Sequence, residues 1–221
     1  MVTRARKCVK EARKEPRKEL AFQAIASANA RYTLGIVPVI VSLLRAVNVG
    51  GHAVIKMAEL RALYESLRLE KVQTYVQSGT VIFETCETDL DRLATRIRTA
   101  IKRKFAVEPD VMLRSADAMR SIVARNPFSH RKGIEPNKLH VQFLPGKLSA
   151  QANTELKALQ LTSEELIPSG QEIYIYFSNG AGKSKLPWPK LQKICGMPGT
   201  GRNWNSVTKL LAMAESLESG N

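Results

Sequence analysis

The stretch "KVQTYVQSGTVIFE", residues 71–84, determines the fold. Both of its ends are rich in β-branched and aromatic residues, which favour strands. Only the three residues 77–79 separate the two ends, so residues 71–76 and 80–84 are predicted to pair as a β-hairpin. What the chain places before and after this hairpin decides the topology.

The hairpin is flanked on each side by one strand and one helix. "VIVSLLR" (39–45) is a continuous apolar run, typical of a central strand, and "PDVMLR" (109–114) is a further strand. Apolar residues recur at helical spacing in both connecting segments; they are Met57, Leu60, Leu63, Tyr64 and Leu67 before the hairpin and Leu90, Leu93, Ile97, Ala100 and Ile101 after it. The order βαββαβ predicts a ferredoxin-like unit, in which the first and third strands are neighbours.

The second half repeats this order less regularly. Its predicted elements are a helix (115–125), a strand (138–144), a helix (149–160), a hairpin made of "ELIPSG" and "QEIYIYF" (171–177), a loop containing Pro187, Pro189 and Pro198, and a final helix with Val207, Leu210, Leu211, Ala214 and Leu217 on its apolar face. We therefore expect an α+β protein of two ferredoxin-like (βαββαβ-type) halves, the second degenerate, ending in a C-terminal helix.

Residues 1–36 differ in composition from the rest of the chain. They hold nine Lys or Arg, three Glu and few large apolar side chains, which predicts a basic, disordered extension. The alternative is a mis-assigned start codon, because valine can be encoded by GTG, which bacteria also use to start translation, and Val37 directly precedes the first strand. The expected parts are then the extension 1–36, a ferredoxin-like half 37–114, and a second α/β half with the C-terminal helix, 115–221.

The chain is strongly basic, with 34 Lys and Arg against 20 Asp and Glu and a net charge of +14. Residues 37–221 alone still carry 25 basic and 17 acidic side chains, so the extension does not account for the imbalance. A basic body favours polyanionic partners, nucleic acid first. The alternative is ordinary solubility charge spread over the surface.

Several classes of protein are excluded by composition. Three cysteines without a CxxC pair argue against a disulfide framework or a zinc site and fit a reducing cytoplasm, with Cys86 and Cys195 expected as buried or incidental thiols. The three histidines, at 52, 130 and 140, have no metal-ligand spacing and are expected in loops or on the surface.

The longest early apolar run, residues 34–44, is too short to span a bilayer. We expect a cytoplasmic protein without membrane contact, metal or cofactor.

A Gly-rich turn after the first strand is the first candidate site. Arg45, Asn48, Gly50 and Gly51 combine a cation with backbone N–H groups of the kind that hold anions. In a ferredoxin-like unit this turn lies at the same end of the sheet as the hairpin tip, which adds Gln77 and Ser78. The alternative is structural: the glycines only permit a tight turn, and Arg45 pairs with a carboxylate.

The second candidate site precedes the last helix. Arg202, Asn203 and Trp204 offer a planar cation, an amide and an aromatic ring, which together could bind a base and a phosphate. The alternative is again structural: Trp204 fills the core, Asn205 or Ser206 caps the helix, and Arg202 fixes a loop.

The segment "NGAGKSKLPWP" (179–189) is not a P-loop. The spacing requires a glycine at position 177, which is Phe, and Pro187 and Pro189 argue against an immediate helix. A flexible basic loop is expected instead. No Ser-His-Asp, Cys-His or paired-carboxylate arrangement can be recognised, so no catalytic residue is assigned.

Several uncommon sequence motifs occur along the chain in a fixed order. "LLRAVNVGG", "MAELRALYESL", "VQTYVQSGTVIF", "NPF", "EIYIYF" and "TGRNWNSVTKL" occur in this order across residues 38–218. The chain thereby resembles the DUF1697 family of bacterial proteins, which usually reads L-L-R-G-I-N-V-G-G where this sequence has Ala46 and Val47, and Q-S-G-N where it has Thr80. The family's name describes its function as unknown, so the resemblance implies a fold and no mechanism.

Two functions from different classes follow, and the sequence does not decide whether the protein is an enzyme. The first is a binding module for nucleic acid or a nucleotide-like polyanion, which a basic stripe across both halves would favour. The second is an enzyme acting on a small phosphorylated substrate at the 45–51/77–79 end, which an enclosed pocket with Arg45, Asn48 and Gln77 pointing inward would favour. An interaction scaffold would show neither feature, and the oligomeric state is left open.

Overall fold

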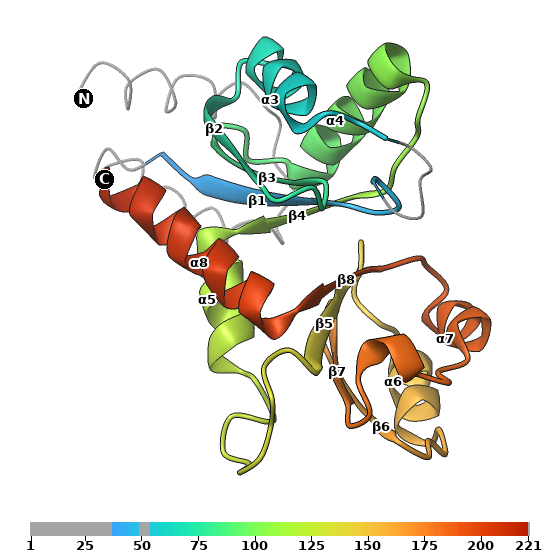
Figure 1. The fold of residues 1–221 in the computed structure, drawn as a ribbon. Coiled ribbons are helices and arrows are strands. Elements are labelled where there is room, and N and C mark those ends of the chain that lie inside the picture. The colour runs from blue at the N-terminus through green and yellow to red at the C-terminus, as the bar shows by residue number, and fades with distance from the viewer. Residues whose placement is uncertain (1–36, 49–53, 221) are drawn as a thin grey trace.

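The computed structural model describes residues 37–48 and 54–220. These residues form an α+β structure of two four-stranded antiparallel sheets and six α-helices (Figure 1). The predictions made for residues 1–36 and for Gly50 and Gly51 lie outside the described residues. Within the described part, none of the helices combines the length and hydrophobicity that crossing a bilayer requires.

The first sheet confirms the predicted strand pairing. Its half of the chain contains β1 (Val39–Leu44), α3 (Met57–Ser66), β2 (Glu70–Tyr75), β3 (Thr80–Glu84), α4 (Leu90–Phe105) and β4 (Val111–Ser115). The strand order is β2-β3-β1-β4, and every neighbouring pair is antiparallel. Helices α3 and α4 cover the outer face of this sheet (Figure 1). Their apolar faces bury Tyr64 and Ile97 against Phe83.

The second sheet has the same strand order as the first. Its half of the chain contains α5 (Ala116–Ala124), β5 (Leu139–Phe143), α6 (Ala150–Lys157), β6 (Glu164–Ser169), β7 (Glu172–Phe177), the 3₁₀ turn η2 (Ala181–Lys183), α7 (Trp188–Cys195), β8 (Thr200–Asn203) and α8 (Trp204–Ser219). The order β6-β7-β5-β8 is again fully antiparallel.

The predicted loop between β7 and the C-terminal helix is wrong, because it contains α7 and β8. Pro189 lies in the first turn of α7, where the backbone N–H has no partner within the helix, so the proline removes no hydrogen bond. Strand β8 has only four residues, one of them Gly201, and therefore gives little strand signal in the sequence.

A single apolar core joins the two halves; we call it the shared core. It contains inward-facing residues of both sheets, among them Val41 and Ile82 of the first and Val141 and Tyr174 of the second. Helices α5 and α8 pack against each other and complete the shared core with Ala116, Met119, Ile122, Val207, Leu210, Ala214 and Leu217. The two halves are therefore held together by buried apolar surface.

Arg114 of β4 adds a buried polar contact between the halves. Its Nε donates to Oε1 of Glu172 at 2.8 Å, and both side chains are almost fully buried. One terminal nitrogen also donates to the carbonyl oxygens of Leu144, at 2.8 Å, and Gln171, at 3.3 Å. Arg114 thus links the edge of the first sheet to the β5 and β7 ends of the second.

The cysteines differ from their predicted state at one position. Cys195 is a free, buried thiol at the end of α7, and burial raises the pKa of this thiol. Cys86 is disulfide-bonded, so the expectation of an incidental thiol is wrong there.

Candidate functional site

Arg202 extends from β8 of the second sheet to the end of the first sheet. One terminal nitrogen donates to the carbonyl oxygens of Leu44, at 3.2 Å, and Ser78, at 2.9 Å. Its Nε donates to the hydroxyl of Thr80 at 3.2 Å. The other terminal nitrogen donates to two acceptors on β8 itself, the Thr200 hydroxyl at 2.9 Å and the Gly201 carbonyl at 2.8 Å. All five N–H groups of the guanidinium are therefore engaged.

The charge of Arg202 has no carboxylate partner among residues 37–48 and 54–220. All five acceptors are neutral carbonyl or hydroxyl oxygens. Burial lowers the pKa of Arg202 to about 10, because desolvation disfavours the charged form. This position therefore holds a partly buried positive charge that the described part of the chain does not neutralise.

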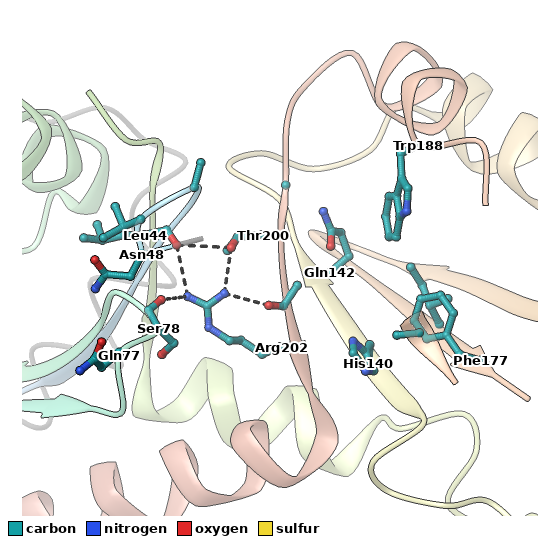
Figure 2. Close-up of a pocket in the computed structure, with 16 residues that line it drawn as sticks. Leu44, Asn48, Gln77, Ser78, His140, Gln142, Phe177, Trp188, Thr200 and Arg202 are labelled. Atoms are coloured by element: carbon teal, nitrogen blue, oxygen red, sulfur yellow. Dashed lines mark hydrogen bonds between the residues drawn. The ribbon is translucent and has the colours of Figure 1, made fainter. Parts of the chain in front are cut away.

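A cleft of about 480 Å³ lies beside Arg202, between the end of the first sheet and the second half (Figure 2). From the first half it is lined by Leu44, Ala46, Val47, Asn48, Gln77 and Ser78. From the second half, the lining includes His140, Gln142, Phe177, Trp188, Thr200 and Arg202. Of the residues predicted to converge here, Asn48 of the β1 turn lines the cleft together with Gln77 and Ser78 of the hairpin tip.

Two side-chain amides in the cleft are available to a ligand. Gln77 and Gln142 have no side-chain hydrogen-bond partner among the described residues. The amide groups of both side chains line the cleft and are accessible from it. Trp188, at the start of α7, is 45% exposed and lies on the second-sheet side (Figure 2). The cleft thus combines free amide groups, an aromatic face and the charge of Arg202.

His140 also lines the cleft; it is half-buried on the strand predicted for residues 138–144 and does not lie in a loop. It lies on β5 with its ring edge-on to Phe177, the ring centres 5.0 Å apart. In "LHVQF" the alternation turns His140 and Gln142 away from the shared core, which was the signal available in the sequence. Burial lowers the pKa of His140, against a weaker opposing hydrogen bond from the Asn137 backbone.

The lowered pKa of His140 predicts a pH-dependent stability. As the pH falls below about 6.5, the unfolded chain binds a proton that folded His140 resists, so stability decreases with falling pH. One such proton changes the free energy of unfolding by at most about 1.4 kcal/mol per pH unit. Urea unfolding between pH 7.5 and 5.5 measures this slope.

His140→Gln should flatten that slope, and His130→Gln, at an exposed turn position, serves as the matched control. An unchanged slope in His140→Gln would show that other groups cause the loss of stability.

The residues of the β1 turn have structural partners. Arg45 forms an ion pair with Asp110 at 3.3 Å and lines a smaller pocket of about 220 Å³ under α7 rather than the cleft. Asn48 has a φ of 56°, and its side chain bonds both backbone polar groups of Ile55, at 3.0 and 2.7 Å. The structural alternative is therefore found at both positions, although Asn48 still lines the cleft.

The departure of Ala46 from the family pattern has a structural cost. Ala46 has a φ of 57°, in the left-handed region where a residue with a Cβ atom is strained by about 1–2 kcal/mol. Glycine, the residue usual in the resembling family, would adopt this conformation without that strain.

Asn203 and Trp204 contribute to α8 rather than to the cleft. The Asn203 side chain accepts the Ser206 N–H at 2.9 Å and caps the helix, so the predicted cap at Asn205 or Ser206 is wrong. Asn203 is the last residue of β8, with the extended backbone that a cap requires. Trp204 is partly buried and packs against the shared core. Of the second candidate site, Arg202 alone lines the cleft.

Comparisons with known proteins agree with this description. None of the curated proteins matches the chain. A solved structure, described as that of the conserved bacterial protein SP0830 from Streptococcus pneumoniae, is similar with a TM-score of 0.65. It is 24% identical and covers 80% of this chain and 99% of its own, a likeness that concerns the fold alone. The model of the family described as "Protein of unknown function (DUF1697)" matches residues 38–174, and the chain belongs to this family.

Proposed function

We propose that each half is a ferredoxin-like unit and that the cleft between them binds a small, nucleotide-like anion. The antiparallel strand orders β2-β3-β1-β4 and β6-β7-β5-β8 support the first statement. The observation that carries the second is Arg202, whose partly buried charge at the cleft has no carboxylate partner among the described residues.

Arg202 acts on the ligand through its charge. Because its five N–H groups already serve the protein, an anion in the cleft is attracted by the electrostatic field rather than by a guanidinium fork. Such an attraction is stronger than in water, since the site has a lower effective dielectric constant. A neutral ligand would leave this charge uncompensated.

The remaining groups favour a planar, hydrogen-bonding ligand. The amides of Gln77 and Gln142 can each donate and accept, as the edge of a nucleobase or the hydroxyls of a sugar require. The indole of Trp188 offers a face on which a base can stack. The volume of about 480 Å³ lies within the usual range of small-molecule sites, about 300–1,000 Å³.

Thermal-shift and calorimetric titration with nucleoside mono- and diphosphates test the proposal. We expect a discrete nucleotide to stabilise the protein at moderate salt, and Gln142→Leu to weaken its binding about tenfold by removing one hydrogen-bonding group. Gln151→Leu, an exposed position on α6, is the matched control. If no nucleotide stabilises the protein, or if both variants bind equally well, the cleft is not the site.

A further inference from the structure

The segment that contains α7 is basic, and the carboxylate that contacts it, that of Glu164 on β6, is buried and accepts from the Ser184 hydroxyl and the Lys185 N–H. Residues 173–214 contain no Asp or Glu, although they hold Lys183, Lys185, Lys190 and Lys193. All four lysines are exposed, and none has an ion-pair partner in the part of the chain that the structure describes. We call these four residues the α7 lysine surface.

Trp188 connects the α7 lysine surface to the cleft. It lies in the sequence between Lys185 and Lys190 and lines the cleft at the beginning of α7 (Figure 2). Among the described residues, the large apolar side chains that are exposed are Val54, Val76 and Trp188, so Trp188 is the one aromatic ring of this set. An exposed indole among unpaired lysines offers stacking and charge at the same place.

We propose that the α7 lysine surface binds single-stranded nucleic acid, with one nucleotide of the strand entering the cleft and stacking on Trp188. The proposal rests on the proposed function, because it places the nucleotide of that function within a longer chain. Proteins that bind single strands combine a basic path along the backbone with aromatic side chains on which the bases stack. In a duplex the bases are already stacked, so the indole would have no free face to contact.

A shallow depression continues the basic path beyond the cleft. It has a volume of about 450 Å³ and is lined by Pro189, Gln192, Lys193, Gly196, Met197 and Pro198. Trp188 and Lys193 thus place one contact at each end of the eight-residue helix α7. A strand leaving the cleft can follow this helix with its phosphates near the lysines.

The basic helix α4 differs from the α7 lysine surface in what surrounds its lysines. On α4, Lys102 pairs with Glu108 at 2.6 Å, and the Lys104 ammonium lies over the ring of Phe105. None of the exposed large apolar residues of the described chain lies on α4. This helix therefore supplies a control with the same residue type and the same change of net charge.

Fluorescence anisotropy with a labelled single-stranded DNA of about 12 nucleotides tests the proposal across a series of salt concentrations. We expect the DNA to bind at least tenfold tighter than a mononucleotide. Lys190→Ser with Lys193→Ser should weaken DNA binding at least fivefold and lower the slope of log K against log salt by about 1.4, or 0.7 for each phosphate contact. The same double variant should change mononucleotide affinity less than twofold.

Lys102→Ser with Lys104→Ser is the matched control and should leave DNA affinity within twofold. Trp188→Ala should weaken both DNA and mononucleotide, because stacking in the cleft is common to both. In Trp204→Phe, Trp188 is the remaining tryptophan, and its fluorescence should be quenched when DNA binds.

The outcomes separate this proposal from the function on which it rests. If a mononucleotide binds and DNA binds no tighter, the proposal is overturned while the proposed function stands. If neither binds, both are wrong. Equal losses in the α7 and α4 double variants, or tighter binding of duplex than of single strand, would also overturn the proposal.

Discussion

Arg114→Met is expected to destabilise the protein by about 3–5 kcal/mol, the usual cost of breaking a buried ion pair from one side. The substitution leaves the Glu172 carboxylate buried, about 4% exposed, without the guanidinium at 2.8 Å. It also removes a donor from the Leu144 carbonyl. Urea unfolding followed by circular dichroism measures the loss.

Arg114→Met combined with Glu172→Leu is the informative control. When both charges are removed together, an apolar pair can fill the space between the halves without an orphaned carboxylate. We therefore expect the double variant to be more stable than Arg114→Met alone. If the two variants are equally unstable, the ion pair is not the cause of the loss.

Arg202→Met is expected to destabilise the protein by about 3 kcal/mol. The Ser78 carbonyl oxygen loses its donor from the other half, at a cost of about 1–3 kcal/mol for a buried group left unpaired. The Leu44 carbonyl oxygen loses the stronger of its two donors and keeps the long bond from the Thr200 hydroxyl, at 3.4 Å. Relief from burying an uncompensated charge offsets part of this cost. Thermal and urea unfolding without ligand measure the difference.

Two further substitutions separate the roles of Arg202. Arg202→Lys keeps the positive charge but loses the planar fork, so it should be nearly as unstable as Arg202→Met while still attracting an anion. Arg61→Met removes an exposed arginine that pairs with Glu65 on α3 and should change stability by less than about 1 kcal/mol. If Arg202→Met were as mild as Arg61→Met, Arg202 would not hold the halves together.

The first sheet could be predicted because its signals are local. The hairpin of 71–84 has two strand-forming ends and a short turn, and the strand order then follows from the chain directions. The same reasoning correctly placed Asn48 near Gln77 and Ser78, but it also predicted Arg45 there, which lines the smaller pocket instead. In the second half, β8 is short and contains Gly201, so its pairing with β5 left no pattern in the sequence.

The cleft could be predicted only in part, because half of it depends on how the two sheets dock. Arg202 was recognised from its motif, but its contact with Leu44 spans 158 positions of the chain. His140, Gln142 and Trp188 were not predicted, because their common position arises from packing between β5, α7 and the first sheet. Packing between distant segments leaves no local periodicity in the sequence.

The shared core has a consequence for how the two halves can diverge in evolution. The outer faces under α3 and α4 and under α6 and α7 belong to one half each, so substitutions there can accumulate independently. On the inner faces, a change of side-chain volume at Val41 forces side chains of the other sheet to repack, because cores are close-packed. The inner residues of both sheets therefore drift as a correlated set, and exchanging one half with that of a relative would create mismatched packing where the halves meet.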